Sequence, residues 1–259
     1  MAIVALSAVT ALFNPTFGQK VDNPELGYSF RIPDGWCEIP KPVVQRFQQA
    51  LIKPGVKPDF IVCAAYEPAT HANYFDLPYI LVQQSPYAEG VERMTISEDD
   101  LIIATAEISG SAAGAVQSAR KDMTPEASKL LNNMQYQGAK YSTQPPAISF
   151  GAIISTPDGQ LHCGAKLLIG RHRRVALDFY ASVNDPKDYS SAQQEAIDSF
   201  QLEPNEQIAF GSGAKSLFDN VIPAAITGAI LAVVGSLFGR SRRRRTPNGN
   251  DAPPTLGST

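Results

Sequence analysis

The side chains best suited to hold a metal ion are the three histidines and the cysteine next to one of them. His162 precedes Cys163 directly, His172 lies in the loop that follows, and His71 lies in a separate loop. Zinc sites draw their ligands from short recurring spacings such as CxxC or HExxH, and the sequence contains none of them. Neighbouring strand residues point to opposite faces, so His162 and Cys163 would not converge on one ion. We therefore expect no metal site and solvent-facing histidines.

Recognised catalytic and phosphate-binding motifs are also missing from the sequence. It has no GxSxG turn for an activated serine and no acidic pair at a distinctive spacing. The run FGSGAKS at 210–216 resembles a phosphate-binding loop, but it lacks the first glycine of that motif and does not follow a strand. We therefore expect no catalytic site and no cofactor. Because triads assemble in space and leave little trace in one sequence, a hydrolase of unknown substrate is the alternative.

The three cysteines, Cys37, Cys63 and Cys163, all lie in apolar stretches. Their number is odd, although the extracytoplasmic location inferred below would permit disulfides. Three buried free thiols are the simplest prediction. A bond between Cys37 and Cys63 is the alternative, because it would tie the turn after the first strand to a central strand.

The best candidate for a contact surface is a basic run in a predicted hairpin loop, Arg171, His172, Arg173 and Arg174. This loop can meet anionic lipid headgroups or an acidic partner, and each basic residue near an anionic surface contributes on the order of 1 kcal/mol. A solvated hairpin tip without a partner is the alternative interpretation.

The C-terminal part of the chain has the pattern of a membrane span. Residues 221–238 read VIPAAITGAILAVVGSLF and carry no charge. About 18 to 20 apolar residues cross a hydrocarbon core of ~30 Å, so we place a transmembrane helix at 219–239. Basic flanks stay on the cytoplasmic side, and the basic residues that follow are Arg240, Arg242, Arg243, Arg244 and Arg245. Residues 240–259 are thus predicted to be a basic stop and a disordered cytoplasmic tail.

Small residues recur every four positions within the span, at Ala224, Gly228, Ala232 and Ser236. Rows of small residues let membrane helices approach closely. The span is therefore predicted to self-associate weakly into a homo-oligomer, unless it is simply rich in alanine and glycine, as many membrane helices are. The predicted partners are the lipid bilayer and an unknown membrane or extracytoplasmic protein.

The N-terminus has the pattern of a signal peptide. Residues 2–13 form an uninterrupted small and apolar run, and Gly18 is small enough to precede a cleavage site. The usual basic segment before the run is missing, so a buried N-terminal strand is the alternative. With a signal peptide at 1–18, the domain at 21–203 and its linker at 204–218 would lie on the extracytoplasmic side of a single-pass membrane protein.

The charge of the chain bears on the kind of partner. The 22 Lys+Arg and 25 Asp+Glu give a net charge of −3 over 259 residues. The part after Gly239 holds five arginines and one aspartate, so the rest of the chain carries −7. An acidic exported part is opposite to what phosphate backbones attract, and we expect no nucleic acid partner.

Between the two ends, apolar runs predict an α+β domain. Alternation at 28–32 indicates a strand, after which Trp36 anchors the core and Pro42 opens a helix. Continuous apolar runs at 59–66 and 77–82 are typical of central strands covered on both faces.

Two further helical regions are predicted. Ser97 caps a helix that runs to about residue 121, and a short helix follows at 124–131. Asp185 begins the last helix of the domain, and Pro204 ends it.

Three alternating runs between residues 147 and 183 predict an antiparallel meander with one apolar face. If Leu167 and Leu177 share that face, an odd loop at 171–173 joins the last two strands. This register places Lys166 opposite Asp178 on the polar face, as a cross-strand ion pair.

GYSFRIPDGW at 27–36 and SSAQQEAIDSFQL at 190–202 resemble the opening strand and closing helix of the PsbP-like family, a group that includes the nuclear-transport factor Mog. The resemblance covers roughly residues 25–203 and implies an α-β-α sandwich around a mainly antiparallel sheet. The chain departs from the family in the helical region at 97–131 and in its C-terminal membrane helix. These departures put a photosynthetic role in doubt.

Members of that family mostly act as accessory or binding proteins and share no catalytic residues. The resemblance therefore implies a non-catalytic binding or accessory domain, part of an envelope or membrane complex. A purely structural component of such a complex is a further alternative. A cleft with convergent polar groups and a perturbed carboxylate or histidine would favour an enzyme instead.

Overall fold

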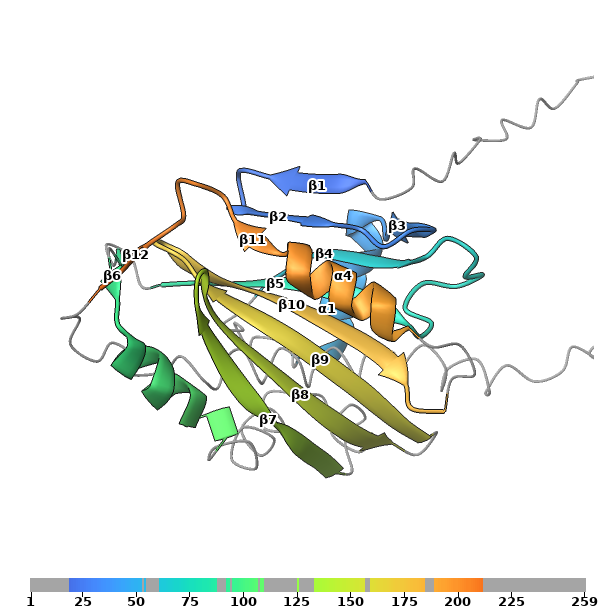
Figure 1. The fold of residues 1–259 in the computed structure, drawn as a ribbon. Helices are drawn as coiled ribbons and strands as arrows, with labels where there is room; N and C mark the ends of the chain where they lie inside the picture. Colours follow the sequence, from blue (N-terminus) through green and yellow to red (C-terminus); the bar gives the residue numbers. More distant parts are fainter. Residues whose placement is uncertain are drawn as a thin grey trace, which may run out of the picture.

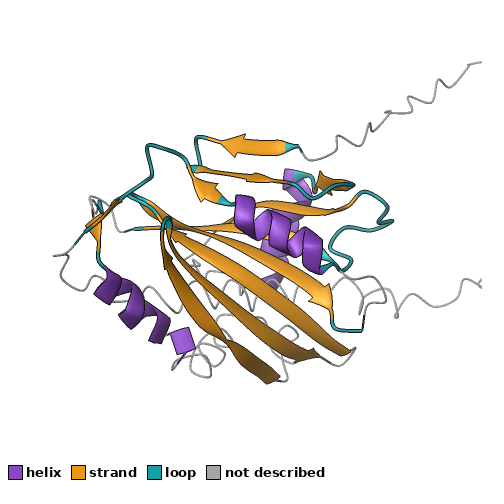
Figure 2. Ribbon diagram, in the orientation of Figure 1, coloured by secondary structure: helices purple, strands orange, loops and turns teal. Residues whose placement is uncertain are grey.

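The computed structural model describes residues 19–52, 54, 61–87, 92–93, 95–106, 108–109, 125, 133–156, 159–184 and 189–211. Its centre is a seven-stranded antiparallel sheet in the order β3-β4-β5-β10-β9-β8-β7. The strands are β3 (Trp36–Glu38), β4 (Ile61–Pro68), β5 (Tyr79–Pro86), β7 (Asn133–Thr143), β8 (Pro146–Thr156), β9 (Gly159–Ile169) and β10 (Arg173–Ser182). The fold is an α+β fold dominated by this sheet, as the sequence predicts (Figures 1 and 2).

One face of the sheet is covered by a helix and a small second sheet. Helix α4 (Ser190–Ser199) crosses this face, and the small sheet has the order β1-β2-β11. Its strands are β1 (Lys20–Asn23), β2 (Tyr28–Arg31) and β11 (Gln201–Leu202). Phe30 of β2 packs edge-on against Tyr66 of β4, with the ring centres 5.1 Å apart. The layer is therefore tied to the large sheet by an aromatic contact.

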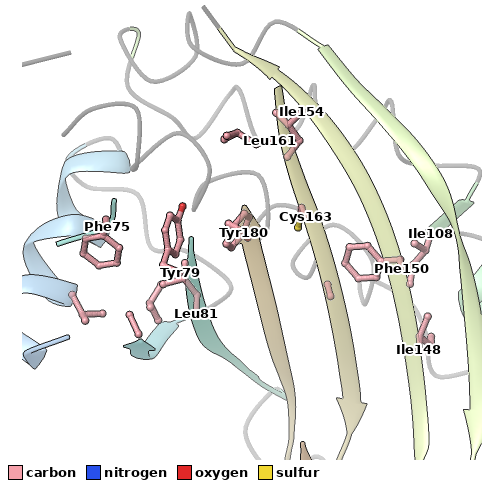
Figure 3. Close-up of a cluster of buried hydrophobic side chains, with 14 of the residues drawn as sticks. Phe75, Tyr79, Leu81, Ile108, Ile148, Phe150, Ile154, Leu161, Cys163 and Tyr180 are labelled. Carbon is pink, nitrogen blue, oxygen red and sulfur yellow. The ribbon is translucent and has the colours of Figure 1, made fainter. Parts of the chain in front are cut away.

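The opposite face is covered by two helices. These are α1 (Lys41–Leu51) and a helix that begins at Glu98 and is described at 98–106 and 108–109. Their inward residues join the apolar core of this face, which Figure 3 shows with Ile108 beside the strands. The sheet is thus covered on both faces, in agreement with the sandwich that the resemblance implies.

Local sequence explains where these elements begin. Pro42 lies in the first turn of α1, where its missing N–H costs no hydrogen bond. Ser97 caps the helix that follows it, because its hydroxyl accepts from the Asp100 N–H at 3.2 Å. The Asp100 carboxylate in turn accepts from the Ser97 N–H at 3.0 Å, so the two residues satisfy each other's backbone.

The register between β9 and β10 corrects the sequence prediction by one residue. Lys166 lies opposite Leu177, and Asp178 lies opposite Ala165. The Gly170 N–H donates to the Arg173 carbonyl at 2.9 Å, so the tip of the hairpin contains two residues rather than three. The predicted ion pair between Lys166 and Asp178 does not form.

The wrong register came from assuming one apolar face. Leu177 and Phe179 point to the α4 side, whereas Leu161 and Cys163 of β9 point to the other side. Both sets are apolar because the sheet is buried on both faces. Apolar alternation therefore could not tell which residues of neighbouring strands share a face.

Strand β7 was not predicted from the sequence. Tyr136 and Ala139 both pack against the core of the α1 side, although they are three positions apart. A bulge between Tyr136 and Gly138 inserts one residue, and Gly138 takes a φ of +106°. The bulge breaks the period of two by which a strand is recognised.

Several predicted segments lie outside the described residues. They are the signal peptide at 1–18, the helical stretch at 110–124, most of the short helix at 124–131, the transmembrane helix at 219–239 and the tail at 240–259. The predicted packing residues of the span, Ala224, Gly228, Ala232 and Ser236, lie outside them as well. Among the helices that the structure describes, none has the length and apolar character to cross a membrane.

Candidate functional site

A groove of about 820 Å³ opens beside helix α4, over the outer strands of the large sheet. Strands β7, β8 and β9 form its floor, and α4 forms one wall. The floor exists because α4 and the small sheet cover the other strands of this face and leave the outer strands open. The residues that the argument below uses are Gln137, Ser149, Gly151, His162, Gly164 and Gln193.

Two glycines form the centre of the floor. Gly151 of β8 and Gly164 of β9 are direct cross-strand partners. A Cβ atom on Gly164 would overlap the amide nitrogen of Gln193, which reaches over from α4. A Cβ atom on Gly151 would lie 3.2 Å from the Oε1 atom of Gln137, which reaches over from β7. The side-chain amides of two glutamines therefore lie against the glycine pair from opposite sides.

A smaller cavity of about 450 Å³ adjoins the groove at the C-terminal end of α4. Lys166 and Asp198 line both cavities. The Lys166 ammonium donates to the carbonyls of Ile197 and Phe200, at 2.8 and 3.1 Å. Lys166 thus satisfies the last carbonyls of α4, and burial lowers its pKa.

The groove contains one half-buried imidazole, that of His162, whose pKa is lowered by burial. The prediction of solvent-facing histidines is therefore wrong for His162. It is also wrong for His71, whose side chain is 15% exposed and lies 3.6 Å from the Glu67 carboxylate. The side chain of His172 is 41% exposed, as predicted.

The two carboxyl groups with strongly raised pKa values lie away from the groove. Burial raises the pKa of Asp178 to about 7, and its carboxylate accepts a hydrogen bond from the Gln83 amide on the α1 side of the sheet. Burial also raises the pKa of Glu67 to about 7, and this group accepts from the Phe75 N–H at 2.9 Å. Neither residue lines the groove.

The predicted basic contact surface lies at the tip and first residues of the β9–β10 hairpin, where two carboxylates pair with it. Arg171 lies 3.0 Å from Glu92, and Arg173 lies 3.0 Å from the buried Glu206. His172 lies 3.4 Å from each of these carboxylates. Glu92 and Glu206 were missed by sequence reasoning, because both are far from the hairpin in the chain.

Arg174, the fourth residue of that run, differs from the other three. Its guanidinium lies 5.4 Å from the centre of the Tyr87 ring, and Arg93 lies 4.8 Å from the same centre. The aromatic ring is thus shared by two cations. Burial raises the pKa of Tyr87 to about 12, so the ring stays neutral in ordinary solution.

The same end of the sheet also carries the last described residues of the chain. The Arg171 N–H donates to the Glu206 carbonyl at 2.8 Å. A few residues later, β12 (Ala209–Phe210) pairs in parallel with β6 (Thr95–Ile96) at the left of Figure 1. The basic hairpin tip and the point where the chain leaves toward the predicted membrane helix are therefore neighbours.

The cysteines are all free thiols, so the alternative bond between Cys37 and Cys63 is not formed. Cys37 lies opposite Glu67 on β4, four residues along that strand from Cys63. Cys163 is buried, whereas the other two are partly exposed. Within the described part of the chain, no group of three or more His, Cys, Asp or Glu side chains is arranged to hold a metal ion.

Comparisons with known proteins find similarity in fold. No protein-family model matches the sequence, and no curated protein matches it significantly. The chain is similar to the solution structure of cyanobacterial PsbP from Synechocystis sp. PCC 6803, with a TM-score of 0.48 and 14% identity over 76% of this chain and 98% of that one. It is also similar to LpqN of Mycobacterium tuberculosis, which is involved in cell envelope biogenesis, with a TM-score of 0.37 and 14% identity over 72% of this chain and 90% of that one. Both matches concern the fold alone.

Proposed function

We propose that residues 21–203 form an exported, non-catalytic binding domain that one C-terminal helix holds at a membrane. The observation that carries this proposal is the separation of the groove from the carboxyl groups of raised pKa. A general acid or base must lie within hydrogen-bond reach of its substrate. Asp178 and Glu67 have pKa values suited to proton transfer, but both are buried and neither lines the cavity.

The groove is instead suited to holding a ligand. Its volume of about 820 Å³ lies in the range of ligand sites, roughly 300 to 1,000 Å³. Small residues line the floor, and the Gln137 and Gln193 amides that lie over its two glycines offer neutral donors and acceptors. His162 lines the groove, but among the described residues no hydrogen bond joins its imidazole to a serine hydroxyl of the lining.

The proposed membrane helix would keep the basic end of the domain near the bilayer. The predicted span starts at residue 219, eight residues after the last described one, Gly211. A fully extended chain covers ~3.3 to 3.6 Å per residue, so this connection reaches roughly 25 to 30 Å. The domain would then meet membrane partners at a high effective concentration.

Within this arrangement, the run from Arg171 to Arg174 would face the headgroups. Arg171 and His172 are the more exposed members, with 38% and 41% of their side chains accessible. Their pairing with Glu92 reduces the net positive charge, so the contact would be weak. A homo-oligomer through Ala224, Gly228, Ala232 and Ser236 would strengthen it by presenting two hairpins to one bilayer.

The topology is tested by protease added to intact cells stripped of any outer barrier. Digestion of the domain with survival of the tail is expected, and a protected domain would contradict the location. The binding function is tested by screening the full chain for esterase, phosphatase and peptidase turnover. Turnover abolished by one substitution, such as His162→Ala, would replace the proposal with the hydrolase.

A further inference from the structure

We propose that the phosphate of an anionic lipid headgroup binds at the tip of the β9–β10 hairpin, between Arg171 and His172, in the place that the Glu92 carboxylate takes in the structure. This inference rests on the proposed function, because it names the ligand of the basic run and the residues that hold it. Glu92 is then an internal competitor, which the headgroup must displace before the domain contacts the bilayer.

The four basic residues of the run divide into two structural residues and two exposed ones. The Arg173 side chain is 23% exposed and lies 3.0 Å from the buried Glu206 carboxylate. Arg174 is half-buried, and its guanidinium lies over an aromatic ring. Arg171 and His172 have 38% and 41% of their side chains accessible. The exposed residues are therefore the ones that can meet a ligand from solvent.

The Glu92 carboxylate shows how these two side chains hold an anion. Arg171 donates to its Oε2 atom through both Nε and Nη2, at 3.1 and 3.0 Å. The Oε1 atom lies 3.4 Å from Nε2 of His172. The hydrogen bond from Arg171 lowers the pKa of Glu92, so the position favours a negative charge. A phosphodiester also carries two charged oxygens on one atom, and arginine binds phosphate and carboxylate in the same way.

The backbone fixes Glu92 beside the hairpin, whereas its side chain is free to be replaced. The N–H of the next residue, Arg93, donates to the Arg171 carbonyl at 2.8 Å. Arg93 is buried, and its guanidinium lies 4.8 Å from the centre of the Tyr87 ring. The Glu92 side chain is 49% exposed, and surface ion pairs of this kind contribute little to stability. A phosphate can therefore take the place of the carboxylate while the backbone stays where it is.

The position of the hairpin favours a lipid as the source of the phosphate. The Arg171 N–H donates to the Glu206 carbonyl at 2.8 Å, which joins the hairpin tip to the segment that leads to the predicted membrane helix. An acidic protein segment offers carboxylates of similar chemistry. The short tether, however, would keep headgroups within reach at a high effective concentration, whereas a protein partner must first arrive.

The test measures binding of the full chain, held in phosphatidylcholine nanodiscs, to phosphatidylglycerol vesicles. Empty nanodiscs and phosphatidylcholine vesicles give the background. Glu92→Gln should raise the affinity by about five-fold, because it removes the competing charge beside Arg171. Glu195→Gln is the matched control, since Glu195 is an exposed residue of α4 and this variant changes the net charge equally. It should leave the affinity unchanged.

A double variant shows whether the gain acts through Arg171. In an Arg171→Ser background, Glu92→Gln should raise the affinity by less than about two-fold, because the two residues act as a coupled pair. Equal gains for Glu92→Gln and Glu195→Gln would reduce the effect to net charge and overturn the inference. A gain from Glu92→Gln that does not depend on Arg171 would overturn it as well.

The remaining outcomes separate this inference from the proposed function. If Arg171→Ser weakens vesicle binding but Glu92→Gln does not strengthen it, the competitor is wrong and the basic contact surface stands. If neither the wild type nor Glu92→Gln binds the vesicles, both fail. Displacement from the vesicles by inorganic phosphate, at an ionic strength where chloride has no effect, overturns the choice of a lipid. Preference for polyglutamate over the vesicles overturns it in favour of an acidic polypeptide.

Discussion

The two faces of strands β8 and β9 differ in the size of their side chains and in their surroundings. On the α1 side, Ile148 and Leu161 are fully or almost fully buried in the core. On the other side, Ser149, Gly151 and Gly164 form the floor of an open groove. In these strands, alternation of large apolar with very small residues therefore gives one face to the core and the other to an open groove. The following experiments test this comparison.

The largest effect is expected on the core face. Ile148→Ala removes a fully buried side chain and should lower the free energy of unfolding by about 2 to 5 kcal/mol. Ser149→Ala, the next residue on the groove face, should change it by less than about 0.5 kcal/mol. Urea unfolding of both variants measures the difference. Similar losses would mean that the groove face is also packed.

A second test uses the buried acid of the core face. Asp178 has a folded-state pKa of about 7, above its ordinary value of 3.8, because burial disfavours its charged form. The folded state thus binds the proton more tightly, so this group favours folding at low pH. Its contribution is lost as pH rises from about 4 to 7, by up to ~1.4 kcal/mol per pH unit.

Asp178→Asn should therefore flatten the pH dependence of the urea midpoint between pH 4 and 7. Glu67→Gln should act in the same direction, because its pKa is also raised to about 7. His162→Gln, on the groove face, should act in the opposite direction, because burial lowers the pKa of His162 and this group favours folding at higher pH. A profile that Asp178→Asn leaves unchanged would mean that this carboxyl ionises without cost.

A smaller effect is expected where the groove meets helix α4. Lys166→Met removes two hydrogen bonds to the last carbonyls of α4, and should lower the free energy of unfolding by about 1 to 2 kcal/mol. Faster hydrogen exchange at Phe200 would locate the loss at the end of the helix. Unchanged exchange there would show that water replaces the ammonium without cost.

The smallest effect on stability is expected at the basic hairpin. Arg171→Ser removes an exposed ion pair with Glu92, which water screens, so the free energy of unfolding should stay nearly unchanged. Binding of the full chain to anionic vesicles should nevertheless weaken by about five-fold, the equivalent of ~1 kcal/mol. Lys140→Ser, at the groove rim, is the control that should leave vesicle binding intact. Equal losses for both would argue for general charge rather than this hairpin.

The sequence predicted the central elements well because their signals are local. Continuous apolar runs marked β4 and β5, and alternation marked β2, β8, β9 and β10. The apolar face of α4 was also predicted, and its residues Ala196 and Phe200 lie in the core. The bulge in β7 interrupted the alternation of its residues, so this strand was not predicted. Strand β10 is buried on both faces, so its register with β9 was predicted wrongly.

The groove itself was not predicted. Its floor comes from β7, β8 and β9, and its wall comes from α4, which begins at Ser190. The one trace in the sequence is the pair Gly151 and Gly164, each placed where a strand would normally carry a side chain. Strands β8 and β9 form a hairpin in which these two glycines are partners, and a glycine inside a strand often marks close approach of another backbone.

The central claim is that the groove beside α4 is where a partner protein binds. It is tested by placing a photo-crosslinking amino acid at Gln194, which lines the groove, and at Glu195, the exposed next residue that does not. In native membranes, the account predicts a discrete protein adduct from position 194 that disappears in the Gly164→Val background, and none from position 195. Equal adducts from both positions, or an adduct at 194 that Gly164→Val leaves unchanged, would contradict it.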